Sequence, residues 1–146
     1  MMNTRKQADL IFGDKNENIA RQVICDNFGI TSASLIFPQG NSNLKKLDTY
    51  NHMDFESDLC LFEIKSRRVN HNSYKTTMVG FDKITVARNS NKDVYFIFMF
   101  NDGNYFYKFN NNDNFYTSIS GRCDRGRDEK KLYYFIPVSC LKKMVV

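Results

Sequence analysis

The sequence lacks the features that mark membrane, secreted or zinc-binding proteins. No apolar run approaches the roughly 18 residues that cross a bilayer, and the first residues, MMNTRKQADL, contain no apolar signal stretch. The four cysteines form no CxxC or Cys/His spacing, which disfavours a zinc ribbon, a disulfide framework and a thioredoxin motif. We therefore expect free thiols, no membrane association, and a location in the cytoplasm or nucleus (of the host cell if the protein is viral) rather than secretion.

Tryptophan is absent, and glutamate is scarce. The chain has 4 Glu against 17 Asn, a bias that favours an AT-rich genome such as that of a virus, phage or parasite. Because Glu is scarce, each Glu that stands among apolar residues is a candidate for a specific role. Glu17 and Glu63 stand in such surroundings.

What is present fits one domain with a basic surface. The 146 residues, of which 42% are hydrophobic, predict a single domain over residues 1–146 with one core. Lys plus Arg exceed Asp plus Glu by 21 − 16 = 5 charges, which favours a polyanionic partner.

The hydrophobic pattern predicts a mixed α/β (α+β) domain. Helical spacing of apolar residues predicts a helix over 14–28, which 4–12 would extend, and a second helix over 76–88. Asn101-Asp102-Gly103-Asn104 is a hairpin-turn signal. Strands are predicted over 30–37, 50–55, 59–65, 94–100, 105–109, 115–119 and 132–138. The element order is helix, strands, helix, strands.

The strand over 59–65 carries the chemistry. Because side chains alternate between the faces of a strand, Glu63 and Lys65 share one face with Leu61. A buried charge is costly alone, so these two need each other, a metal or an anionic ligand. Asp54 lies across a predicted turn at 56–58 and can approach them. Two carboxylates can hold Mg²⁺, and an adjacent lysine can orient water and offset developing charge, as phosphodiester hydrolysis requires.

Asp54 followed by Glu63-Ile64-Lys65 resembles the motif of the PD-(D/E)XK nuclease superfamily, with Met53 in place of the proline. The resemblance implies a restriction-endonuclease-like core, in which helices flank a central mixed β-sheet. It also implies that Asp54, Glu63, Glu17 and the carbonyl of Ile64 bind Mg²⁺ or Mn²⁺ and that Lys65 is the catalytic lysine. Lys83 is the candidate for a further lysine that faces the site, where it would bind the nucleic acid.

The implied activity is DNA hydrolysis by an endonuclease, acting as a homodimer where both strands are cut. A Holliday-junction resolvase of the same fold and a catalytically inactive nucleic-acid-binding module are the alternatives.

Each candidate also has a structural interpretation. Glu63 and Lys65 could form an ordinary ion pair at an exposed strand end. Asp54 could cap a turn while Asp58 takes the catalytic role. Glu17 could belong to a capping box that starts at Asp14.

Two basic tracts are candidates for binding the DNA backbone, although either could be a solvated loop. The first contains Arg67, Arg68 and Lys75, and no acid occurs from 64 to 81. The second contains Arg122, Arg125 and Arg127, diluted by nearby acids. His71, which follows the first tract, could contact phosphate or be a hydrogen-bonded surface histidine.

Overall fold

The computed structural model describes residues 45–47, 53–120 and 131–144. The predicted helix over 14–28 and the predicted strand over 30–37 lie outside these residues. In the described part the helices are too short to span a bilayer. The elements are β1 (Lys45–Lys46), β2 (Phe55–Glu56), β3 (Cys60–Ser66), β4 (Thr76–Gly80), α2 (Phe81–Asn89), β5 (Asp93–Phe100), β6 (Gly103–Lys108), β7 (Thr117–Ser120), β8 (Lys131–Pro137), the 3₁₀ turn η2 (Val138–Cys140) and β9 (Lys142–Lys143).

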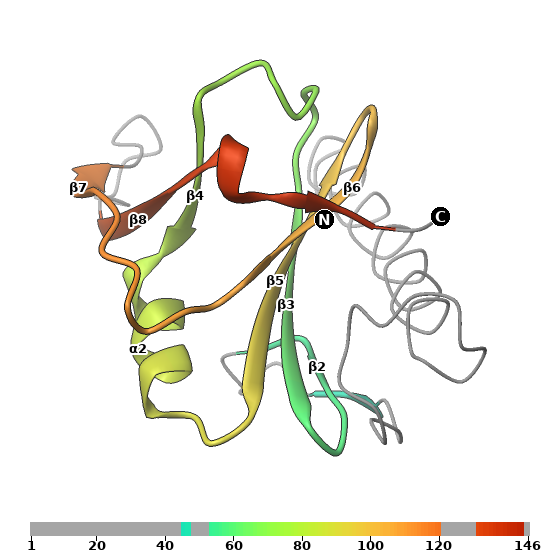
Figure 1. Cartoon of the computed structure of the whole chain (residues 1–146), viewed down its shortest axis with the longest axis vertical. Helices are drawn as coiled ribbons and strands as arrows, with labels where there is room; N and C mark the ends of the chain where they lie inside the picture. Colours follow the sequence, from blue (N-terminus) through green and yellow to red (C-terminus); the bar gives the residue numbers. More distant parts are fainter. Residues whose placement is uncertain (1–44, 48–52, 121–130, 145–146) are drawn as a thin grey trace, which may run out of the picture.

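A six-stranded mixed sheet forms the centre of the described fold, in the order β1-β2-β3-β5-β6-β9. β3 and β5 run parallel side by side through the middle of Figure 1, and the other pairs are antiparallel. The parallel pair requires a crossover, which β4 and α2 provide. Both central strands are rich in apolar residues because each is covered on two faces.

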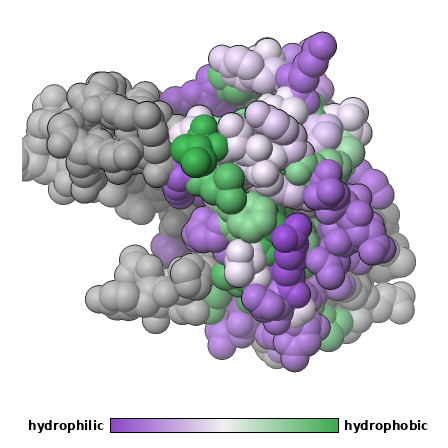
Figure 2. Space-filling model, turned by 90° about the vertical axis from the view of Figure 1, so that its left-hand side faces the viewer, coloured by the Kyte–Doolittle hydropathy of each residue, from purple (hydrophilic) through white to green (hydrophobic). Residues whose placement is uncertain are grey.

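A second, three-stranded antiparallel sheet has the order β4-β8-β7 and lies beside the central sheet, with α2 (Figure 1). Ile119 and Leu132 are partners across β7 and β8, and they remain 68% and 40% exposed. Figure 2 shows the side of the molecule on which these strands lie, where a small hydrophobic group near the centre and scattered smaller hydrophobic areas interrupt a mostly hydrophilic face.

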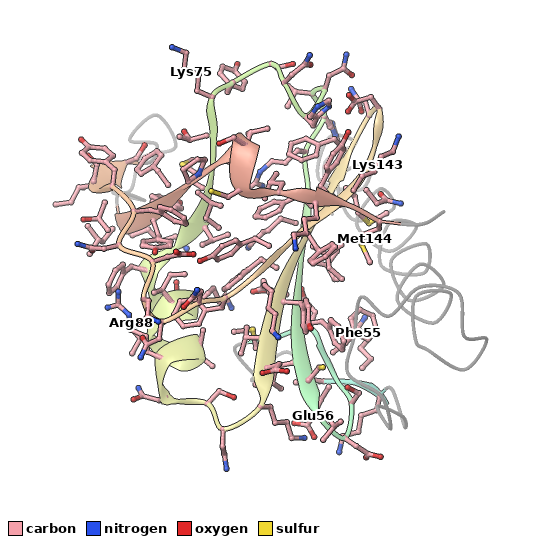
Figure 3. The ribbon with its side chains drawn as sticks, in the orientation of Figure 1. Phe55, Glu56, Lys75, Arg88, Lys143 and Met144 are labelled. Carbon is pink, nitrogen blue, oxygen red and sulfur yellow. The ribbon has the colours of Figure 1, made fainter. Side chains whose placement is uncertain are left out.

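Alternation along β3 and β5 divides the core into two clusters, one on each face of the central sheet. Cys60, Phe62 and the partly buried Ile64 belong to the first cluster, as do Phe55 and Met144, which lie on the same side of the β3–β5 pair in Figure 3. Leu61 packs against the second cluster, which is built from β4, α2, β5 and β8. The predicted division of this strand into two faces is therefore confirmed.

The predicted helix over 76–88 is wrong in its first half. Thr76–Gly80 is strand β4, paired antiparallel with β8, and the helix begins only at Phe81. The reason is that Thr77 and Val79 are β-branched and buried at a period of two, which suits a strand paired with a partner remote in sequence.

The described part of the fold has fewer helices than the predicted core, in which helices flank a central sheet. It contains one α-helix and a 3₁₀ turn. The mixed α/β class and the mixed central sheet are confirmed, and they are compatible with a restriction-endonuclease-like core. The hairpin turn at 101–104 is confirmed by the antiparallel pairing of β5 with β6.

We expect the two described cysteines to differ sharply in reactivity. Cys60 is fully buried, and burial raises the pKa of its thiol to about 11, whereas Cys140 is exposed. Since only the thiolate reacts, a Cys60-specific signal should appear in an Ellman assay only after denaturation. Comparing the wild type with Cys60→Ala and Cys140→Ser at pH 8 assigns the signals. Rapid labelling of Cys60 in the folded protein would contradict its place in the core.

Candidate active site

Asp54 is held against the edge of β3 by two hydrogen bonds. The Ile64 N–H donates to Asp54 Oδ2 at 2.8 Å, and the Asp54 N–H donates to the Phe62 carbonyl at 2.9 Å. These bonds continue the β2–β3 pairing, in which Phe55 lies opposite Phe62. The sequence did not determine this register. It places the Asp54 carboxylate beside the middle of β3, next to Glu63.

Glu63 is a buried carboxylate with an unsatisfied oxygen. Its exposed fraction is 3%, and Oε2 has no hydrogen-bond partner among the described residues. Burial raises the pKa of Glu63 to about 8, with further contributions from a hydrogen bond and charge repulsion with Asp54. The Lys65 and Lys83 ammonium groups oppose that rise without cancelling it. The described side chains therefore stabilise the Glu63 anion poorly, although a second carboxyl group lies beside it.

Lys83 reaches the same site from α2. Its Nζ lies 3.4 Å from Glu63 Oε2, an ion-pair distance without hydrogen-bond geometry. Lys83 is also 4.0 Å from Asp82 Oδ2, and its side chain is 19% exposed. The structure therefore places Lys83 beside Glu63. Lys83 comes from helix α2, which starts later than the helix predicted over 76–88.

The main chain of Ile64 points to the Asp54 side of β3. The Ile64 N–H donates a hydrogen bond to Asp54 Oδ2. In a β-strand, the N–H and the C=O of the same residue point toward the same neighbouring strand. The Ile64 carbonyl is therefore directed to the edge of β3 where Asp54 lies. The resemblance to PD-(D/E)XK nucleases implies that this carbonyl is a metal ligand.

A divalent cation fits these groups. Mg²⁺ and Mn²⁺ prefer hard oxygen ligands, and the site offers two neighbouring carboxylates and a carbonyl directed to the same edge. A cation would also explain why Glu63 Oε2 is buried with no hydrogen-bond partner in the described part of the chain. No cluster of three or more His, Cys, Asp or Glu side chains suited to a metal occurs in the described residues, so Asp54 and Glu63 stand there as a pair. Glu17, the third predicted acid, lies outside them.

Asp58, the competing acid, is placed differently. It is exposed in the turn between β2 and β3, where Ser57 Oγ accepts a hydrogen bond from the Cys60 N–H. Asp54 is thus the acid that the fold brings to Glu63.

The first basic tract continues from the end of β3. Arg67 is partly buried and donates to the Met78 carbonyl at 2.6 Å, while Arg68 and Lys75 are exposed. Lys75 projects from the upper end of the molecule in Figure 3. The second tract, with Arg122, Arg125 and Arg127, lies outside the described residues.

The structure adds a polar pair that the sequence did not predict. His71 Nδ1 lies 2.6 Å from Asp102 Oδ2, and the His71 ring stacks on Tyr105 at 4.5 Å. Asp102 belongs to the hairpin turn, and nothing in its local sequence signals a partner 31 residues away.

Comparison with models of protein families shows the family to which the chain belongs. A family model described as "Phage putative PDDEXK endonuclease" matches residues 31–144, which is more than half of the chain. The chain belongs to this family. The resemblance drawn from Asp54 and Glu63-Ile64-Lys65 is thereby confirmed, and membership in the phage PDDEXK endonuclease family supports a nuclease of phage origin that acts on nucleic acid. Comparison with curated proteins and with solved structures finds no match.

Proposed function

We propose that the chain is a single metal-dependent nuclease domain that hydrolyses DNA phosphodiester bonds as an endonuclease. The observation that carries this proposal is the buried Glu63 carboxylate beside Asp54 and two lysines, in a member of a nuclease family. One oxygen of this carboxylate has no hydrogen-bond partner within the described ranges. A structural ion pair would not require a second carboxylate next to the first, because two like charges destabilise one another.

In this proposal Asp54, Glu63 and the Ile64 carbonyl hold Mg²⁺ or Mn²⁺, and Glu17 completes the ligand set as the family resemblance implies. The bound cation supplies the Lewis acid that polarises the phosphoryl oxygen and lowers the pKa of a water molecule. Asp54 is already oriented for this role by the Ile64 N–H.

Lys65 provides a positive charge on the same strand face as Glu63. Its ammonium group orients the attacking water and offsets the charge that develops on the phosphoryl oxygens. Lys83 supplies a second ammonium near Glu63 Oε2, where it limits the repulsion between the two carboxylates.

Cleavage assays test the function directly. The protein is incubated with supercoiled, linear and branched DNA in the presence of Mg²⁺, Mn²⁺ or EDTA. We expect nicking or linearisation of supercoiled DNA with either metal and none with EDTA. Preference for branched DNA would identify a junction resolvase instead, and salt-dependent binding without cleavage would identify an inactive binding module. Light scattering with and without DNA tests whether the protein forms the homodimer that the family resemblance implies.

The exposed part of the first basic tract should contribute to the salt dependence of DNA binding. Each cation that neutralises a phosphate releases counterions and contributes about 0.9 to the log–log slope. We expect Arg68→Gln combined with Lys75→Gln to flatten the slope by up to about 2, as measured by fluorescence anisotropy between 50 and 300 mM salt.

The matched control is Lys142→Gln with Lys143→Gln. It makes the same charge change on the exposed edge strand β9, which is separated from β3 by β5 and β6. Equal slopes for the two double variants would remove Arg68 and Lys75 from the DNA-binding surface.

A further inference from the structure

A pocket of about 390 Å³ lies where the end of β3 meets β4 and β8. Its size falls within the roughly 300–1,000 Å³ typical of small-molecule sites. Apolar side chains make up much of its wall, and a guanidinium and an exposed aromatic ring are also part of it. The lining residues that matter here are Arg67, Tyr74, Met78, Phe100, Phe135 and Val138.

Arg67 brings a positive charge to this pocket and has no acidic partner among the described residues. Its guanidinium donates to the main-chain carbonyls of Met78 at 2.6 Å and Ser66 at 3.4 Å, and no carboxylate in the described part of the chain forms an ion pair with it. Burial lowers the pKa of Arg67, although a guanidinium remains protonated at neutral pH. A partly buried cation with only neutral acceptors favours binding of an anion.

The rest of the pocket is suited to a flat apolar group. Tyr74 lines the pocket and is 68% exposed, and Met78, Phe100 and Phe135 offer apolar contact surface. An inorganic anion would make no use of these side chains. A nucleobase would, because bases stack on aromatic rings largely independently of sequence.

The pocket lies close to the proposed catalytic residues. Arg67 follows Lys65 by two positions and so continues the same face, about 7 Å farther along the chain. Its N–H donates to the Met99 carbonyl at 2.9 Å, which extends the β3–β5 pairing past the end of the strand. A nucleotide bound at Arg67 would therefore belong to the substrate strand near the scissile bond.

We propose that this pocket binds one unstacked nucleotide of the DNA substrate, with its phosphate at Arg67 and its base against Tyr74 and the apolar wall. The proposal rests on the proposed nuclease function and extends it. The pocket would bind a single nucleotide that has left the base stack. Because unstacking costs least where DNA is unpaired or distorted, such a site favours this DNA over a regular duplex.

Binding of mononucleotides tests the pocket without any cleavage. The protein, labelled at Met and Val methyl groups, is titrated by NMR with dAMP, dTMP, deoxyadenosine or inorganic phosphate, in EDTA. We expect saturable shifts at Met78 and Val138, with a dissociation constant for the nucleotides about tenfold or more below those for phosphate and for the nucleoside. Nucleotides that bind no better than phosphate would overturn the proposal.

Two variants separate the two halves of the ligand. Tyr74→Ala should weaken nucleotide binding about fivefold or more and leave phosphate binding unchanged, while Arg67→Met should weaken both. Ile119→Ala, equally exposed but outside the pocket, is the matched control. Arg67 donates a hydrogen bond to β4, so Arg67→Met is used only if its thermal midpoint shows that the protein is folded. If this variant does not fold, Tyr74→Ala alone tests the pocket. Equal losses in Tyr74→Ala and Ile119→Ala would refute the assignment.

The outcome is separable from that of the nuclease assay. DNA cleavage without nucleotide binding would refute the pocket and leave the nuclease. Nucleotide binding by a protein that cuts no DNA in either metal would refute the nuclease, and with it the assignment of the pocket to a substrate strand.

Discussion

Glu63→Gln and Asp54→Asn are each expected to abolish metal-dependent DNA cleavage while leaving the protein folded. Both replacements are nearly isosteric and remove a negative charge from the proposed metal site. Loss of several kcal/mol of stabilisation by the metal corresponds to a rate reduction of about 10³-fold or more. Single-turnover cleavage of supercoiled DNA in Mg²⁺ measures this effect.

The stability of these variants distinguishes a metal site from a structural pair. Burial, and after it the neighbouring Asp54, raise the pKa of Glu63 above its value in the unfolded chain, so this carboxyl destabilises the fold at neutral pH. Glu63→Gln removes the ionisable group, and its thermal midpoint in EDTA should therefore equal or exceed that of the wild type. In Asp54→Asn the side-chain oxygen can still accept the Ile64 N–H, so the main chain at β3 should be retained. Mg²⁺ should raise the midpoint of the wild type but not of either variant.

Asp58→Asn is the matched control for this experiment. Asp58 lies four residues after Asp54, in the turn between β2 and β3, and it is exposed. We expect cleavage by this variant at the wild-type rate. Near-normal cleavage by Glu63→Gln, or loss of cleavage in Asp58→Asn, would show that the site has been assigned to the wrong residues.

Lys65→Ala is expected to reduce the cleavage rate by a factor of roughly 10² or more while DNA and Mg²⁺ binding change little. This is the scale observed when one preorganised electrostatic group is removed from an active site. Lys65→Arg should restore activity poorly, because a planar guanidinium does not replace a compact ammonium group. Single-turnover cleavage rates and thermal midpoints, measured on the same preparation, separate an effect of Lys65→Ala on catalysis from an effect on stability.

A structural role for Lys65 predicts the opposite pattern. The variant would then lose stability and keep its rate per folded molecule. Lys108→Ala provides the comparison, since Lys108 forms an exposed ion pair with Asp93 at 3.7 Å and such pairs contribute little. A lowered midpoint with an unchanged rate in Lys65→Ala would falsify the catalytic assignment.

The central part of the fold could be predicted because its signals are local. The shared face of Glu63 and Lys65 follows from the period of two along a strand, whatever that strand pairs with. The hairpin between β5 and β6 likewise depends on four consecutive residues. The family was evident from one short motif of the same kind, Asp54 with Glu63-Ile64-Lys65, and the family comparison confirmed it.

Other features could not be predicted because they depend on contacts between distant segments. β4 was predicted as helix because Met78 and Val79 fit either period, and the antiparallel pairing with β8 decided between them. The choice of Asp54 over Asp58 depended on the register Phe55–Phe62, which local sequence does not encode.

The amino-acid sequence alone therefore predicted the family, from a carboxylate, a second carboxylate and a lysine in the order that these nucleases share, and the family comparison confirmed it. Only the tertiary structure decided which groups meet. It placed Lys83 at Glu63 and paired His71 with Asp102. It also left Arg67 without an acid among the described residues, at a pocket lined by the segment between β3 and β4 and by residues of β4, β5, β8 and η2. The physical reason is that side-chain direction is set by neighbouring backbone dihedrals, whereas proximity between strands and helices is set by how the whole core packs.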